Sequence, residues 1–145
     1  MKPLPLLTCL IFAVATAALA HSGVKNVIVK ARMDAMSSIS VELKTLGLMA
    51  NGKTDFDLTA ARAAASAIAK HAAEIPDLFK AQEDDPKSEA KDAIWTNFND
   101  FAEQAFDLEG VAFGLSTSLE TSSDLPAALK SLGQTCRACH KDYRD

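Results

Sequence analysis

Aromatic residues are scarce in this chain of 145 residues, at 6%, although apolar residues make up 48% of it. Basic residues are in the minority as well, with 15 Lys and Arg against 19 Asp and Glu, and no basic run occurs. The resulting net charge of −4 removes the electrostatic attraction that drives most binding to nucleic acid, so we expect no nucleic-acid partner. The length and the apolar content are typical of one globular domain.

The most apolar stretch, at the N-terminus, is too short and too interrupted to be a membrane-spanning helix of about 20 residues. Lys2 is its only charged residue, and the segment is predominantly apolar from Leu6 to Val14 before it closes on small residues. This layout predicts a secretory signal peptide, residues 1–20, that is cleaved after Ala20. Residues 21–145 would then form an exported, periplasmic domain.

No segment alternates apolar and polar residues with the period of a strand, so we expect no β-sheet. Apolar residues instead recur in steps of three and four, which predicts four amphipathic helices over residues 28–50, 58–79, 94–119 and 125–143. Asn51-Gly52 is expected to end the first helix, Asp57 to cap the second, and the polar segment 80–91 to form a surface loop. Four helices with short connections predict an all-α fold, an antiparallel up-down-up-down four-helix bundle.

Cysteine is rare too, with three in the whole chain, and Cys9 falls inside the predicted signal peptide. The other two belong to Cys136-Arg137-Ala138-Cys139-His140, a C-x-x-C-H motif typical of covalent haem c attachment. Residues three apart on a helix share a face, so both sulfurs can reach the two vinyl groups on one edge of a haem. We therefore predict one haem c, bound through thioethers to Cys136 and Cys139, with His140 as an axial ligand of the iron.

Two other uses of these cysteines lack supporting residues. A thioredoxin-like dithiol needs strands that the pattern does not contain, and a zinc site needs two further ligands, whereas His21 and His71 are the only other histidines. Cys136 and Cys139 also continue the apolar face of the last helix, which would press the haem against the bundle interior. A buried haem would explain how a chain with few aromatics fills its centre, and it predicts a loosely packed haem-free protein.

The ligand on the other side of the iron is less clearly defined by the sequence. Met36 lies on the first helix with Arg32 and Leu43 beside the main apolar face, and a thioether can bind haem iron. Core filling is the alternative role for Met36, as for any methionine on such a face. Met33 is offset around the helix from this position, and His71 could be either a second histidine ligand or a partly exposed side chain.

The residues together resemble the class II c-type cytochromes, which comprise cytochrome c-prime and its low-spin relatives called cytochrome c-556. The resemblance covers all of residues 21–145 and includes Arg32-x-x-x-Met36, LGLMANG at 46–52, IPDLF at 75–79, Ala93-Ile94-Trp95, and the C-x-x-C-H motif followed by Tyr143-Arg144. By this resemblance Met36 stands where low-spin members carry the sixth ligand and where high-spin members carry a residue that covers the distal face.

The resemblance has three further implications. Arg144 is similar to the family's basic residue beside the proximal histidine, and Arg32 is similar to one near the haem edge. The family also forms homodimers through its first two helices, so a homodimer is expected by analogy.

Two functions follow, according to the role of Met36. If Met36 binds the iron, the haem is six-coordinate and carries out outer-sphere one-electron transfer, with a reduction potential raised by the Met/His pair. If Met36 only packs above it, a five-coordinate, high-spin haem could bind nitric oxide or carbon monoxide. We do not expect an enzyme, because no distal histidine with a catalytic partner is visible. Expected partners are periplasmic or membrane-bound redox proteins with basic patches, and the haem-attachment machinery during maturation.

Overall fold

The computed structural model describes residues 23–145, and these form an all-α structure. The elements are α1 (Val27–Ala50), α2 (Leu58–Leu78), α3 (Ala93–Thr96), α4 (Phe98–Ser118), the 3₁₀ turn η1 (Ser122–Asp124) and α5 (Leu125–Tyr143). In this part of the chain no strand forms, and the β-type pairing is one isolated bridge between Ala90 and Arg144. The predicted all-α fold is confirmed, and the predicted signal peptide, residues 1–20, lies outside the described residues.

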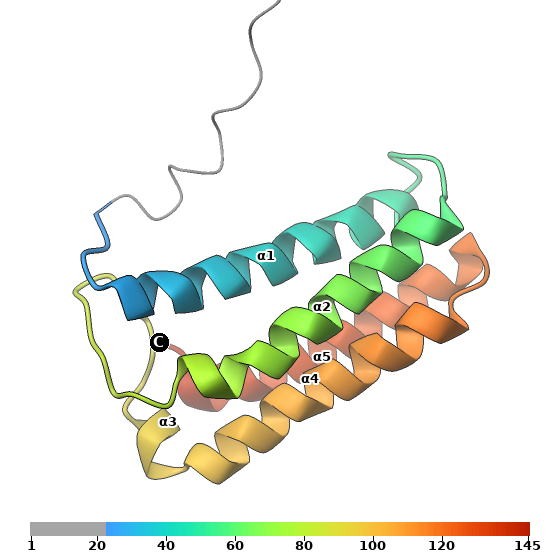
Figure 1. Cartoon of the computed structure of the whole chain (residues 1–145). Helices are drawn as coiled ribbons and strands as arrows, with labels where there is room; N and C mark the ends of the chain where they lie inside the picture. The colour runs from blue at the N-terminus through green and yellow to red at the C-terminus, as the bar shows by residue number, and fades with distance from the viewer. Residues whose placement is uncertain (1–22) are drawn as a thin grey trace, which may run out of the picture.

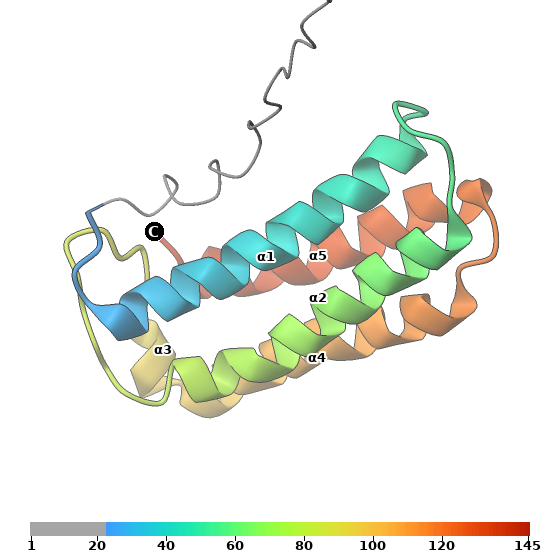
Figure 2. The ribbon, with the colours of Figure 1, turned by 45° about the horizontal axis from the view of Figure 1, so that its top comes forward.

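The four long helices form a bundle in which each packs on two neighbours (Figures 1 and 2). In order around the bundle they are α1, α2, α4 and α5, so that α1 lies beside both α2 and α5. The pairing of α2 with α4 is the most extensive, and that of α1 with α5 is the sparsest of the four. Within residues 23–145 no helix is both long enough and apolar enough to cross a membrane.

Local side-chain chemistry sets the helix ends. The Asn26 side-chain oxygen accepts a hydrogen bond from the Ile28 backbone N–H at 2.9 Å, which caps the start of α1. Gly52 has a φ of +64°, a left-handed conformation that glycine adopts without steric cost, just after α1. The Asp57 carboxylate accepts from the Ala60 N–H at 3.0 Å and caps α2. The predicted end of the first helix and start of the second are therefore confirmed.

The helix predicted over residues 94–119 is interrupted, so that prediction is wrong in part. Asn97 leaves the helical region with φ −126° and ψ 41°, and it separates the short α3 from α4. Because of the break, α3 runs in a different direction from α4 (Figure 1). The Trp95 indole N–H on α3 donates to the Phe79 carbonyl at 2.8 Å. Apolar spacing continues across the break, and for this reason periodicity alone did not reveal it.

The core changes character along the bundle. On α2, which packs most extensively against α4, most of the buried side chains are alanines, including Ala61, Ala65 and Ala72, which are fully buried. Small side chains allow the two helices to approach closely and to pack densely. Aromatic side chains gather at the other end of α2, where the Phe101 ring lies 5.0 Å from that of Phe79. This aromatic end of the bundle borders the cavity described next.

Candidate functional site

A cavity of about 340 Å³ lies between α1, α5 and the segment 80–91, which we call the strap. Its volume falls within the range of roughly 300–1,000 Å³ that is common for small-molecule and cofactor sites. The apolar part of its lining includes Val29, Phe79, Ile94 and Phe101. The cavity therefore has the size and the apolar lining that a flat, hydrophobic prosthetic group requires.

The α5 side of the cavity is formed by the C-x-x-C-H motif. Cys139 and His140 line the cavity, whereas Cys136 lies one turn earlier, half-buried against the core and outside the lining. Both cysteines are free thiols. The structure therefore brings Cys139 and His140 to the cavity and keeps Cys136 on the adjoining turn of the same helix.

Burial sets the ionisation of these groups. Burial raises the pKa of the Cys139 thiol to about 11, helped by the neighbouring Cys136, and it raises the pKa of Cys136 as well. Burial also lowers the pKa of His140, with a further contribution from the charge of Arg144 that Glu89 partly offsets. His140 is consequently neutral at pH 7, and neutral imidazole is the form that binds metals.

The α1 side of the cavity presents two thioethers. Met36 lines the cavity as the sequence predicts, and Met33, three residues earlier, lines it too. Although Met33 is offset around the helix from Met36, residues three apart on a helix share a face, so both side chains reach the cavity. His71, by contrast, lies half-buried on α2 outside the lining, with its Nδ1 3.4 Å from a Glu74 carboxylate oxygen.

Arg32 lines the same cavity, and its guanidinium donates hydrogen bonds to three backbone carbonyls. Its Nε donates to Leu78 O at 3.0 Å, one terminal nitrogen donates to Glu83 O at 2.8 Å, and the other donates to Ala81 O at 2.5 Å. The side chain is only 3% exposed, and desolvation lowers its pKa while nearby Glu83 opposes that shift. The resemblance predicts a residue near the haem edge, whereas the contacts in the structure show an attachment to the strap.

The strap is more than the surface loop that the sequence predicts, because it contributes Ser88 and Ala90 to the cavity lining. Its Asp85 is 5% exposed and accepts hydrogen bonds from the backbone N–H groups of Lys25 at 2.8 Å and Asn26 at 3.1 Å. Sequence reasoning missed this contact. An Asp before a proline indicates a turn, but nothing in the pattern points to a partner 60 residues earlier.

Arg144 joins the other end of the strap to α5. Two of its guanidinium nitrogens bind one carboxylate oxygen of Glu89, at 2.6 and 2.5 Å, and its backbone forms the bridge to Ala90. The side chain lines the cavity beside His140, whose carbonyl accepts from the Arg144 N–H at 3.1 Å. Arg144 thus lies beside His140, as the resemblance predicts, and it also holds the strap.

The donor set of this cavity suits haem better than a bare metal ion. Within residues 23–145 no three His, Cys, Asp or Glu side chains come together as a metal cluster, which the zinc alternative requires. The cavity instead offers one imidazole from α5 and thioethers from α1, the two ligand types of a Met/His haem, next to two free thiols.

Comparisons with known proteins agree with these features. The family model described as Cytochrome C′ matches residues 27–144. Cytochrome c-554 of Cereibacter sphaeroides is 33% identical over 150 residues, covering 99% of this chain and 98% of that protein. Cytochrome c-556 of Agrobacterium fabrum is 33% identical over 117 residues, covering 80% of each chain.

Solved structures share the fold. Cytochrome c′ from Rhodopseudomonas palustris is 21% identical with a TM-score of 0.77, and the match covers 83% of this chain and 98% of that one. The nitric oxide complex of a cytochrome c prime variant from Alcaligenes xylosoxidans is 19% identical with a TM-score of 0.70, covering 81% and 94%.

Proposed function

Since the chain belongs to the cytochrome c′ family, we propose that it is an electron carrier in which His140 and Met36 bind the haem iron. Proteins of this family are haem cytochromes that carry electrons or bind gases, and they work with redox partners. The chain carries covalently attached haem c. What we propose beyond this is the identity of the ligands and the choice between the two activities.

The residues that would hold the haem come from two helices. Cys136 and Cys139 would form the two thioether links, and because both lie on the inward side of α5 they would hold one edge of the porphyrin against the core. His140 supplies a neutral imidazole as one axial ligand. When bound, the haem supplies a one-electron Fe(III)/Fe(II) couple. The apolar lining around it excludes water and so favours the reduced, less charged form.

The observation that carries the proposal is the position of Met36. Its side chain lines the cavity from α1, while His140 lines it from the neighbouring α5. A Met/His pair leaves no open position for a gas molecule and raises the reduction potential, which suits outer-sphere electron transfer. Met33 lines the same cavity, so it is the competing thioether and also the natural control.

Gas binding is the second candidate function. The similar fold from Alcaligenes xylosoxidans is a nitric oxide complex, so a protein of this fold can hold that ligand. If Met36 packs over the iron without binding it, the same cavity would suit a five-coordinate, high-spin haem that takes nitric oxide or carbon monoxide.

Visible absorption spectra in both redox states, with and without carbon monoxide, distinguish the two functions. We expect a low-spin wild type that carbon monoxide does not change, a high-spin Met36→Leu variant that binds carbon monoxide, and a Met33→Leu variant like wild type. A high-spin wild type would falsify binding by Met36 and favour gas binding. A spectral change in Met33→Leu alone would move the ligand to that residue.

We also propose that residues 1–20 are removed on export and that residues 21–145 act in the periplasm, where covalent haem attachment and redox partners are expected. The mass of the protein purified for these spectra tests the processing, because it should equal that of residues 21–145 plus one haem. The acidic composition favours partners that present basic patches.

A further inference from the structure

Arg32 connects α1 to the backbone at the start of the strap. Its three guanidinium nitrogens donate to the carbonyls of Leu78, Ala81 and Glu83, which belong to the last turn of α2 and the first residues after it. Hydrogen bonds from a charged donor are stronger than neutral ones, and here they are almost completely withdrawn from water. The planar guanidinium suits this task because its N–H groups point in fixed, different directions.

Two aromatic rings complete the surroundings of the guanidinium. Its central carbon lies 4.6 Å from the Phe79 ring centroid and 5.4 Å from that of Trp95, within the range of cation–π attraction. The hydrogen bond from the Trp95 indole to the Phe79 carbonyl joins these two residues to each other. Arg32 is therefore the point where α1, the end of α2 and α3 meet.

Polar contacts hold the rest of the strap. Near its middle, Asp85 accepts from the Lys25 and Asn26 amides, and at its far end Arg144 binds Glu89. Lys87 and Ser88, which lie between these two attachments, line the cavity. Hydrogen bonds and an ion pair thus hold the strap along one side of the cavity. Arg32 provides two of these hydrogen bonds, to Ala81 and Glu83, and a third to Leu78 at the end of α2.

We propose that Arg32 is a positioning residue that holds the strap against the cavity and thereby limits the access of water to the haem site. Its role is then to order the protein backbone. By limiting solvent exposure of the haem, it raises the reduction potential, because greater exposure stabilises the more highly charged oxidised state. The contact between Arg32 and the strap is shown by the hydrogen bonds of the protein itself. Only the expected effect on the reduction potential rests on the proposed electron-transfer function.

Hydrogen exchange of the haem-loaded protein tests the strap directly. In Arg32→Lys and Arg32→Gln we expect the amides of residues 80–91 to exchange about tenfold faster or more, since the donors of Lys sit on a single nitrogen, Gln has only two N–H donors, and neither matches the three separate nitrogens that Arg32 uses. Amides in the core of α2, residues 61–72, should keep their wild-type protection. Unchanged exchange in the strap of both variants would overturn the proposal, as would an equal increase in both segments.

The reduction potential separates geometry from charge. Lysine keeps the positive charge of Arg32, so we expect both Arg32 variants to have a lower potential than wild type if strap position is what matters. The proposal would be overturned if Arg32→Lys kept the wild-type reduction potential and strap protection while Arg32→Gln had a lower potential and less protection. That result would show that only the positive charge matters. If Arg32→Gln does not fold, the result with Arg32→Lys decides.

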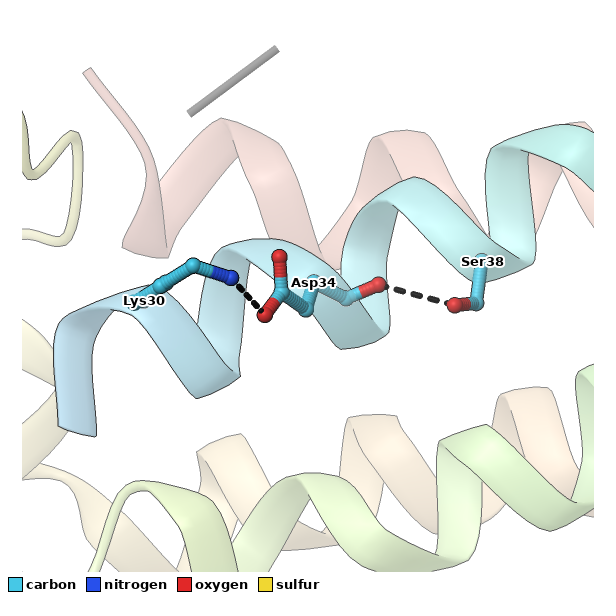
Figure 3. Close-up of polar contacts among 3 residues, drawn as sticks. All are labelled: Lys30, Asp34 and Ser38. Atoms are coloured by element: carbon cyan, nitrogen blue, oxygen red, sulfur yellow. Dashed lines mark hydrogen bonds and ion pairs between the residues drawn. The ribbon is translucent and has the colours of Figure 1, made fainter. Parts of the chain in front are cut away.

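Lys30→Ala is the matched control on the same helix. Lys30 binds the Asp34 carboxylate at 2.5 Å on the exposed side of α1, where Ser38 donates to the Asp34 carbonyl (Figure 3). Its removal deletes one positive charge two residues from Arg32 without touching the strap, so we expect neither readout to move. The wild-type spectrum and its response to carbon monoxide test the proposed function separately, because strap exchange does not depend on which ligand binds the iron.

Discussion

The two halves of the bundle are built differently. Between α2 and α4, small side chains such as Ala65 and Ala112 are fully buried and the helices pack densely. Between α1 and α5, the helices contact each other sparsely and enclose the cavity, with half-buried Met36 and Cys139 on either side. In the first half, side chains fill the space between the helices. In the second half a cavity remains, which the strap covers on one side and which a bound group would fill.

The two halves differ in whether their packing is determined by residues close in the sequence or by residues far apart in it. Dense packing in the α2–α4 half follows from residues spaced three and four apart along each helix, which is local information. The α1–α5 half depends on contacts such as Asp85 with Lys25 and Arg144 with Glu89, which join residues more than 50 positions apart in the sequence. The half that encloses the cavity is therefore the half held by contacts between residues far apart in the sequence.

Removing both haem attachments should have the largest effect. We expect Cys136→Ala, Cys139→Ala to lose covalent haem and to leave the cavity unfilled. Without the haem, the side chains that line the cavity of about 340 Å³ lose the packing partner that the bound group provides. The α1–α5 half should therefore collapse or loosen, with a broad thermal transition by circular dichroism.

Hydrogen exchange on the same variant locates the damage. We expect protection to fall in α1 and α5 and to persist in the alanine-rich part of α2 and α4, away from Phe79 and Phe101, which line the cavity. The single variants Cys136→Ala and Cys139→Ala, which each keep one thiol, are controls for the substitution itself. A sharp, native-like melt of the double variant would contradict the division into two halves.

Features set by neighbouring residues along one helix could be predicted from the sequence. The ends of helices at Gly52 and Asp57 were predicted because left-handed glycine and a capping carboxylate act on adjacent backbone groups. The C-x-x-C-H motif likewise identified the face of α5 that meets the cavity, because that face is set by spacing along one helix.

The remainder could not be predicted, for physical reasons. The break at Asn97 preserves apolar spacing on both sides, so periodicity does not detect it. The strap looks like a polar surface loop because its charged residues are recognised only together with their distant partners. Arg32 was expected near the haem edge from the resemblance alone, and its three carbonyl acceptors became visible only in the fold.

A core truncation in the densely packed half should have an intermediate effect. Ile68 is fully buried on α2, and we expect Ile68→Ala to lower the free energy of unfolding by about 2–5 kcal/mol through lost burial and a new cavity. Because Ile68 does not line the cavity, the haem spectrum should stay unchanged. Denaturant unfolding of the holoprotein measures the first effect, and absorption spectra measure the second. A changed spectrum would show that the halves are coupled more closely than their contacts indicate.

The smallest effect is expected where the strap meets the start of α1. Hydrogen bonds from the Asn26, Lys87 and Lys25 amides hold the pKa of Asp85 below its ordinary value, while burial opposes them. In the unfolded chain an aspartate has a pKa of about 3.9. The charge of Asp85 therefore stabilises the folded state fully above about pH 4, and this contribution is lost as the pH falls through the lower folded-state pKa.

Asp85→Asn should isolate that contribution, because asparagine keeps an oxygen acceptor but has no charge. We expect a modestly lower Tm than wild type at pH 7, and we expect the two Tm values to converge as the pH falls below about 4 and through the lower folded-state pKa, where wild-type Asp85 becomes protonated as well. Asp84→Asn, which removes a charge from the exposed neighbouring position, should have a smaller effect at pH 7. If the difference in Tm between wild type and Asp85→Asn stayed constant from pH 7 to pH 2, Asp85 would act through its shape alone. Its charge would then not stabilise the attachment of the strap to the start of α1.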